Sequence, residues 1–239
     1  MSDPSARPVG PVPRPVLKER LARAQRQALT GLARPLPQRV CAEVVGDWPA
    51  LADGAPWLRF GARRHTGCPA LAHALPIRTA SLGGLLLTHV LDGHSTCAAV
   101  LAEAERVLAP GGQLLIAGLN PWSLCGLREW AAARGGRDRL SQYLRAPGSL
   151  RAQLLALGLP VEAVRTVFYQ PPLRLRRGFD DGALMDRLGS RLLPGVGGAY
   201  LLVARKQRAG LRPLWSPSRK LLTAPARALS AAVRADASA

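Results

Sequence analysis

The chain has 239 residues, of which 48% are hydrophobic, and it carries 33 basic against 15 acidic side chains. This length favours a single domain with flanking tails over two domains. The sequence contains no uninterrupted run of about 18 apolar residues, the length that a membrane-spanning helix needs. Prolines occupy the N-terminus where a signal peptide needs an apolar core. We therefore expect a cytoplasmic protein without a transmembrane segment.

The N-terminal part of the sequence predicts a tail followed by one helix. Residues 1–15 are rich in proline, so we expect them to be disordered or extended. Residues 16–32 place apolar side chains at helical spacing along one stripe, which predicts a lead-in helix packed on the domain. The domain itself is expected to cover residues 16–206.

From residue 39 onward short apolar runs alternate with helical stretches, a pattern typical of parallel strands joined by helices. The clearest strands are 84–90 and 113–118, and between them we expect a helix over 95–108, with Ser95 as its N-cap, and a Pro-Gly-Gly turn. The other expected strands are 39–45, 57–60, 74–77, 163–169 and 199–204, and another helix is expected over 149–157. The predicted fold is an α/β, doubly wound, mostly parallel, Rossmann-like sheet of six to seven strands with helices on both faces.

Most of the excess basic charge lies in the two flanks of the chain. Residues 1–38 carry seven basic and two acidic side chains, residues 205–239 carry eight and one, and the middle carries 18 and 12. Arginine outnumbers lysine thirty to three, a bias that a GC-rich genome produces without any ligand. Two interpretations stay open: a solvated, disordered tail over residues 207–239, or a basic surface for nucleic acid or another anionic partner.

The segment from Gly84 to Trp122 carries the most informative pattern. It resembles the fourth strand, the following helix and the fifth strand of class I S-adenosylmethionine-dependent methyltransferases of the type 11 group, in which E-x-x-R-V-L-x-P-G-G precedes an apolar strand. The matching residues here are Glu103, Arg106, Val107, Leu108, Pro110, Gly111, Gly112, Leu114 and Ile116. The continuation G-L-N-P-W-S-L resembles a small bacterial branch of that group. The alternative is another doubly wound domain that uses the same Pro-Gly-Gly turn.

This resemblance implies S-adenosyl-L-methionine as the cofactor, an undefined methyl acceptor, and donor-site residues after the first and fourth strands. The implied cofactor-binding residues are Glu43, Gly46, Asp47, His89 and Leu91. The sequence departs from the family at Val45, where the family has glycine so that the backbone can approach the cofactor. It also has no carboxylate after the second strand for the ribose hydroxyls, and no acid before the fourth strand near the adenine.

His89 is the candidate catalytic residue, because it lies at the predicted carboxyl end of the fourth strand and could contact the cofactor or act as a general base. A structural role is the alternative for a lone histidine. Asp92 could orient His89 or cap the following helix, and the capping role is favoured. Asn120 and Trp122 are candidate substrate-pocket residues because they follow the fifth strand, but they could also form a turn and cover the core.

The remaining histidines and the cysteines suggest no metal site and no disulfide framework, since no C-x-x-C pair or metal-ligand spacing is present. The resemblance and the departures from it leave two functions open. The first is an S-adenosylmethionine-dependent methyltransferase. The second is a catalytically inactive methyltransferase-like protein that binds nucleic acid or a protein partner through its basic flanks, and the missing ribose carboxylate favours it. A nucleotide-dependent oxidoreductase would need G-x-G-x-x-G after the first strand, which this sequence lacks.

Overall fold

The structure is a computed structural model, and it describes residues 10–32, 40–52, 57–61, 68–92, 96–134, 144–174 and 182–207. The chain divides into the units Met1–Arg208 and Ala209–Ala239, and every described residue belongs to the first. The expectations for residues 1–9 and 208–239, including their disorder and their anionic partners, lie outside the described residues. Within the described ranges, no helix is long and apolar enough to cross a bilayer.

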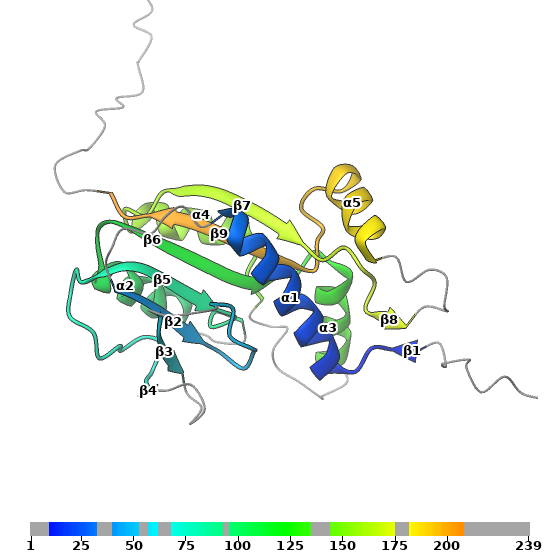
Figure 1. The fold of residues 1–239 in the computed structure, drawn as a ribbon, viewed down its shortest axis with the longest axis horizontal. Helices are drawn as coiled ribbons and strands as arrows, with labels where there is room; N and C mark the ends of the chain where they lie inside the picture. Colours follow the sequence, from blue (N-terminus) through cyan, green and yellow to red (C-terminus); the bar gives the residue numbers. More distant parts are fainter. Residues whose placement is uncertain are drawn as a thin grey trace, which may run out of the picture. The chain divides into compact units, whose positions relative to one another are not determined.

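Strands and helices alternate along most of the described chain (Figure 1). In chain order they are β1 (Gly10–Pro11), α1 (Arg14–Leu32), β2 (Cys41–Val45), β3 (Trp57–Gly61), β4 (Cys68–Pro69), β5 (Leu82–Thr88), α2 (Cys97–Val107), β6 (Leu108–Leu119), α3 (Leu124–Arg134), α4 (Pro147–Ala156), β7 (Val161–Val167), β8 (Leu173–Arg174), α5 (Gly182–Leu192) and β9 (Ala199–Arg205).

Seven of these strands form one sheet in the order β4-β3-β2-β5-β6-β9-β7. The pairs from β4 to β6 are parallel, whereas β9 runs antiparallel to both β6 and β7. Strands β1 and β8 form a separate two-stranded sheet. The prediction of a doubly wound, mostly parallel α/β sheet of Rossmann-like type is confirmed.

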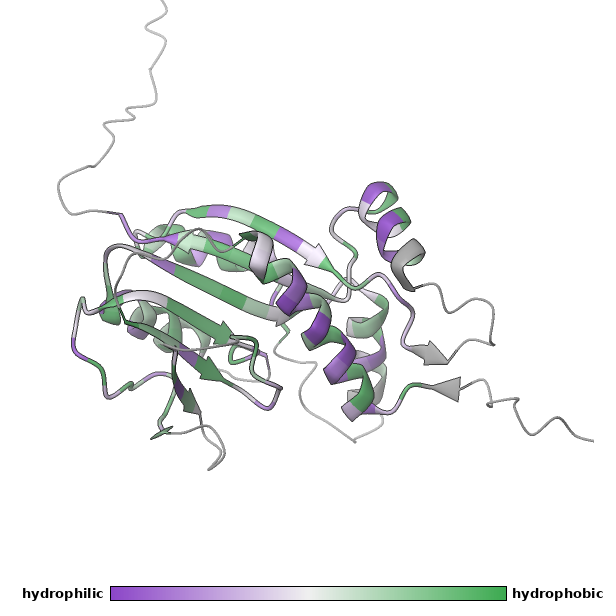
Figure 2. Cartoon of the chain, in the orientation of Figure 1, coloured by the Kyte–Doolittle hydropathy of each residue, from purple (hydrophilic) through white to green (hydrophobic). Residues whose placement is uncertain are grey.

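Side chains of the central strands alternate between two buried faces. Leu85 and Leu87 of β5 belong to the core cluster that contains α2 and α4, whereas Leu86 belongs to the cluster that contains α1. Figures 1 and 2 show α1 crossing one face of the sheet, α2 and α4 on the opposite face, and hydrophobic strands between them. Burial on both faces explains why β5 and β6 read as continuous apolar runs.

Helix α1 begins two residues before the predicted lead-in helix, with Pro15 in its first turn, where the missing N–H costs no helical hydrogen bond. Its buried residues follow one stripe, and its principal partners are β9 and β7. Near the sheet centre Ala22 and Ala28 pack in one cluster with Leu86 and Leu115. The earliest helix of the chain therefore covers strands that come near its end.

The connection from β2 to β3 is shorter than most parallel crossovers, which usually contain a helix and a dozen or more residues. None of its described residues, 46–52, is helical. Leu51 and Ala52 instead fold under α1 and pack against the sheet, while Arg26 Nε of α1 donates to Ala50 O at 3.2 Å. Helix α1 thus occupies the face that a first crossover helix would cover.

The expected strand over 74–77 is wrong, because β4 forms the sheet edge and Ala74 makes only an isolated bridge to Leu71. Side chains of α2 take the backbone groups of this segment. Glu103 Oε1 accepts from Leu75 N at 2.7 Å, and Arg106 Nη2 donates to Ile77 O at 2.9 Å. Backbone groups satisfied in this way are not available for a strand ladder.

The other differences concern turns and missed helices. The Pro-Gly-Gly turn lies inside β6, where the register between β5 and β6 shifts and Gly111 has a φ of +80°. The predicted N-cap Ser95 lies outside the described residues. Helices α3 and α5 were not predicted: the residues of both segments were interpreted as variable connections between strands.

Gly118 and Gly148 provide a matched test of the packing. A Cβ at Gly118 would lie 2.5 Å from Tyr200 Oη, whereas a Cβ at Gly148 would meet nothing within 4 Å. We expect Gly118→Ala to lower the free energy of unfolding by about 1–3 kcal/mol, because Tyr200 is fully buried. Gly148→Ala should change it by less than about 1 kcal/mol, in the stabilising direction. Urea unfolding measures both, and equal losses would contradict the described core.

Candidate functional site

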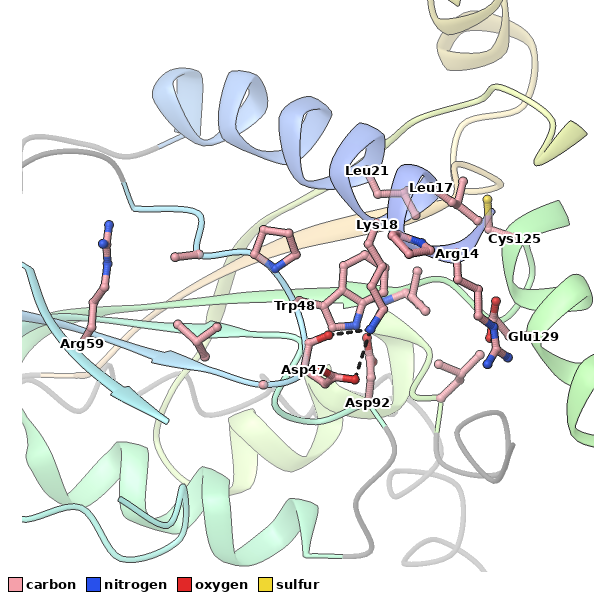
Figure 3. A pocket seen from close by; sticks show the side chains of 17 residues that line it. Arg14, Leu17, Lys18, Leu21, Asp47, Trp48, Arg59, Asp92, Cys125 and Glu129 are labelled. Atoms are coloured by element: carbon pink, nitrogen blue, oxygen red, sulfur yellow. Dashed lines mark hydrogen bonds and ion pairs between the residues drawn. The ribbon is translucent and has the colours of Figure 1, made fainter. Parts of the chain in front are cut away.

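A cavity of about 760 Å³ lies at the carboxyl edge of the sheet. Its walls are the first turns of α1, the loop Val45–Ala50 after β2, the end of β6, and one side of α3. Figure 3 shows side chains from these elements converging on one space, with Arg59 of β3 apart from the others. A volume of this size suits a small organic ligand or cofactor.

The cavity lies where the order of the strands reverses. From β2 the chain passes to β3 on one side, whereas from the neighbouring β5 it passes to β6 on the other. The connections after β2 and β5 therefore continue toward opposite sides of the sheet, and residues of both, Val45–Ala50 and Asp92, line the cavity. In open α/β sheets this switch point is the usual ligand crevice.

Gly46 holds the two loops against each other. Its N–H donates to Thr88 O at 2.9 Å, and a Cβ on Gly46 would lie 2.6 Å from His89 O. Only glycine fits this close approach of two backbones. Gly46 and Asp47 are the two predicted cofactor-binding residues that line the cavity.

His89 is at the centre of a buried polar network behind the cavity wall. Its Nδ1 lies 2.7 Å from Asp92 Oδ2 and its Nε2 lies 3.0 Å from Gln25 Oε1 of α1. The ring stacks on Trp48 with centroids 3.8 Å apart and an angle of 12° between the planes. His89 is 2% exposed and has a φ of +52°, so the network fixes a tight backbone turn after β5. Both ring nitrogens are hydrogen-bonded within the protein.

Asp92 orients His89, and the favoured prediction that it caps the following helix is wrong. Besides His89, its Oδ2 accepts from Leu119 N at 2.9 Å, and the N-cap of α2 is Thr96. The second oxygen, Oδ1, is buried and has no hydrogen-bond partner among the described residues. Asp92 lines the cavity, and a buried acceptor without a partner is a feature that calls for an explanation.

Two ion pairs line the cavity. Lys18 Nζ donates to Asp47 O at 2.6 Å, lies 3.2 Å from Asp47 Oδ2, and sits 5.3 Å from the ring centroid of Trp48. Arg14 Nη2 of α1 lies 2.8 Å from Glu129 Oε2 of α3. Charges of both signs therefore face a space that apolar side chains, Leu17, Leu21 and Leu119 among them, also line. Such a lining suits a ligand that itself carries both charges.

Glu43 and Leu91 lie behind this cavity and do not line it. Glu43 is completely buried, and its carboxylate accepts from Leu51 N at 2.7 Å, Ala52 N at 3.3 Å and Thr88 Oγ1 at 2.7 Å. These bonds fasten the short β2–β3 connection to the sheet. Leu91 is buried in the core cluster that contains α2.

Asn120 and Trp122 also lie outside the cavity lining. Asn120 is buried, and its Nδ2 donates to Gly195 O at 2.6 Å and Gly197 O at 2.9 Å, which ties the end of β6 to the loop after α5. Trp122 is 76% exposed. The structure thus brings neither side chain to the cavity, although both follow β6 as the sequence predicts.

Among the charged and aromatic residues that line the cavity, sequence reasoning missed Arg14, Lys18, Trp48, Arg59 and Glu129. Lys18 follows the buried Leu17 directly, but a helical stripe does not show which polar neighbour faces a cavity. Trp48 follows the predicted Gly46-Asp47 pair and was the one residue that the loop position could have revealed. In the described part of the chain, no group of three or more His, Cys, Asp or Glu side chains could hold a metal ion.

No protein-family model and no curated protein matches the sequence. Solved structures do match the fold. A methyltransferase of Thermotoga maritima that depends on S-adenosylmethionine is 15% identical, with a TM-score of 0.55 over 81% of this chain and 94% of that one. The corresponding figures are 18%, 0.52, 81% and 95% for a Haloferax volcanii complex of the Trm112 activator with a methyltransferase.

A methyltransferase of Archaeoglobus fulgidus that depends on S-adenosylmethionine is 12% identical, with a TM-score of 0.52 over 80% of this chain and 98% of that one. At these identities the likeness establishes the fold. The chain therefore has the fold of class I methyltransferases, and its activity must be argued from the cavity itself.

Because the carboxylate of Glu43 is buried and hydrogen-bonded, its substitution should lower the stability of the fold. We expect Glu43→Gln to lower the free energy of unfolding by about 2–3 kcal/mol, because hydrogen bonds to a charged acceptor are lost. Glu105→Gln is the matched control, since Glu105 is partly exposed and forms one ion pair with Lys206; it should change stability by less than about 1 kcal/mol. Denaturant unfolding compares the two. Equal effects would show that Glu43 does not fasten the β2–β3 connection.

The cysteines give a second prediction. Cys68 is exposed and the other three are buried. Burial raises the pKa of Cys125 to about 12, so this thiol keeps its proton, and remains unreactive, up to strongly alkaline pH. Burial also raises the pKa of Cys41 and Cys97. Native protein at about pH 8 should therefore release one equivalent of thiolate from a disulfide reagent, and Cys68→Ser should release none. Rapid reaction of further thiols in that variant would contradict the described burial.

Proposed function

We propose that the chain is a methyltransferase that uses S-adenosylmethionine and acts on an acceptor still to be identified. The observation that carries this proposal is the cavity at the switch point between β2 and β5, in a sheet with the fold of class I methyltransferases. A fold alone hosts many activities, so the cavity has to suit the cofactor.

The cavity suits this cofactor in size and in the chemistry of its walls. S-adenosylmethionine carries a carboxylate, an ammonium and a sulfonium, and the walls carry three basic and three acidic side chains. We propose that Arg14 and Lys18 bind the carboxylate, and that Asp47 and Glu129 bind the cationic groups. The acceptor oxygen Asp92 Oδ1, which has no partner among the described residues, would take a hydrogen bond from the ligand.

The bound cofactor would supply a methyl group on a sulfonium, which is already activated for transfer. The protein then has to position two reactants and exclude water. Leu17, Leu21 and Leu119 line the cavity and would keep water from the reacting atoms. The imidazole of His89 would act by positioning, since it links α1, the loop after β2 and the turn after β5.

The second candidate function is a catalytically inactive relative that binds a partner through its basic flanks. Two observations favour it. The first is that the carboxylate of Glu43 is fully used by bonds within the protein. The second is that residues 47–52, the described part of the β2–β3 connection after Gly46, are not helical, so they offer no helix N-terminus to the ligand. The cavity with its charged walls favours the first candidate, because a protein that acts through its flanks would not need it.

Calorimetric titration with S-adenosylhomocysteine and S-adenosylmethionine tests the proposal. We expect binding by the native chain and a roughly tenfold or greater loss in Asp47→Asn, because a charge-assisted bond contributes about 1.5–3 kcal/mol. Glu162→Gln is the matched control, since Glu162 is also a partly exposed carboxylate with one ion pair, to Arg205 on the sheet. It should bind as the native chain does.

Two outcomes would contradict the proposal. Absence of any binding heat up to millimolar ligand would favour the inactive relative and turn attention to the basic flanks. Equal weakening by Asp47→Asn and Glu162→Gln would mean that the ligand binds elsewhere. Asp47 is a cleaner probe than Gly46, because any side chain at Gly46 collides with the backbone of His89 and would disturb the fold.

A further inference from the structure

The exposed apolar side chains of the described residues are concentrated in two segments. Fifteen large hydrophobic side chains are exposed, and nine of them lie within residues 122–130 and 185–196. The most exposed are Trp122 at 76% and Leu192 at 73%. Single exposed apolar residues are ordinary, whereas a cluster of them marks an interaction surface.

Asn120 brings the two segments together. Its side chain donates to Gly195 O and Gly197 O, and its N–H donates to Gly198 O at 3.1 Å. The start of α3 and the exit of α5 are therefore neighbours, and Figure 1 shows both helices at the same end of the sheet. We call this surface the α3/α5 face. It consists of Trp122, Leu124, Leu127, Trp130, Met185, Leu188, Leu192, Leu193 and Val196.

Helix α5 carries basic side chains beside its exposed leucines. Leu188 and Leu192 are one helical turn apart, and Arg187 and Arg191 form a parallel stripe one residue earlier; all four are exposed. Figure 2 shows hydrophobic and hydrophilic bands side by side along this helix. A helix with an apolar stripe flanked by arginine is typical of helices that lie in a membrane interface.

The acidic side chains of the described parts of these helices are turned away from this surface. Asp186 of α5 accepts from Tyr169 N at 2.6 Å and from Gln170 Nε2 at 3.2 Å. Glu129 of α3 faces the cavity and pairs with Arg14. The α3/α5 face therefore presents apolar and cationic groups without a described carboxylate between them.

We propose that the α3/α5 face docks on the surface of a lipid bilayer that contains anionic lipids. Tryptophan and leucine would enter the interface between headgroups and acyl chains, and Arg187 and Arg191 would contact lipid phosphates. The charge of the whole chain, +18, favours an anionic surface further. This inference goes beyond the proposed function and does not depend on it.

A second copy of the chain fits the same surface less well. A symmetric dimer through the α3/α5 face would bring the arginine stripes of the two copies toward each other, and like charges at an interface oppose association. A bilayer with anionic headgroups complements both the leucines and the arginines at once.

Cosedimentation of the full chain with vesicles tests this docking. We expect binding to vesicles of phosphatidylcholine with phosphatidylglycerol, and much weaker binding to phosphatidylcholine alone. The double variant Leu188→Glu/Leu192→Glu should lower the partition coefficient at least about tenfold, because it removes two apolar anchors and adds two negative charges. Arg187→Ser/Arg191→Ser, which keeps the leucines, should lower binding to the anionic vesicles only.

The matched control is Leu71→Glu/Leu155→Glu, which makes the same change of charge at two leucines that are 60% and 63% exposed elsewhere. It should keep nearly native binding. Equal losses in the two leucine variants would show that net charge or the basic flanks bind the lipid, and would overturn the proposal. Absence of binding to anionic vesicles would also overturn it. So would dimerisation of the native chain that Leu188→Glu/Leu192→Glu abolishes. Circular dichroism of each variant verifies folding.

Discussion

The close approach of the loops after β2 and β5 is the constraint on which the rest of the site depends. Gly46 permits it, since a Cβ there would collide with the backbone of His89. Glu43 stabilises this approach, because its buried carboxylate accepts hydrogen bonds from Thr88 on β5 and from the backbone of residues 51 and 52. With this connection fixed, Trp48 can stack on His89, and the loop can form one wall of the cavity.

Helix α1 covers the face of the sheet that the short β2–β3 connection leaves without a helix. It packs on β7 and β9 and near the sheet centre. Lys18 and Arg26 reach the loop after β2, and the buried Gln25 reaches His89 after β5. The same helix therefore covers the hydrophobic face and supplies cations to the cavity. In this molecule the core and the site share an element, so substitutions on its buried stripe would change both stability and ligand geometry.

The sequence predicted those parts of the fold that local patterns determine. Strands β5 and β6 are buried on both faces, so their continuous apolar runs were identified. The expected strand over 74–77 failed because Glu103 and Arg106, about thirty residues away, take its backbone groups. No local pattern reveals such a partner.

The site was less accessible to sequence reasoning for a similar reason. Gly46 and Asp47, which the family resemblance singled out after the first strand, line the cavity, and their contact with a cofactor stays a prediction. The role of Asp92 was misjudged, since its partners His89 and Leu119 come together only in the folded sheet. The contact between His89 and Gln25 spans 64 residues. Arg14, Lys18 and Glu129 belong to the cavity only because α1 and α3 meet across it.

The packing of α1 against β9 also governs when the domain can form during synthesis. The first helix leaves the ribosome long before its partner strand, because nearly the whole domain separates them in the sequence. Until β9 is made, the apolar stripe of α1 has no sheet surface of β9 to cover and is open to chaperones. The domain therefore closes late, when its last strand inserts between β6 and β7 and meets the helix that was made first.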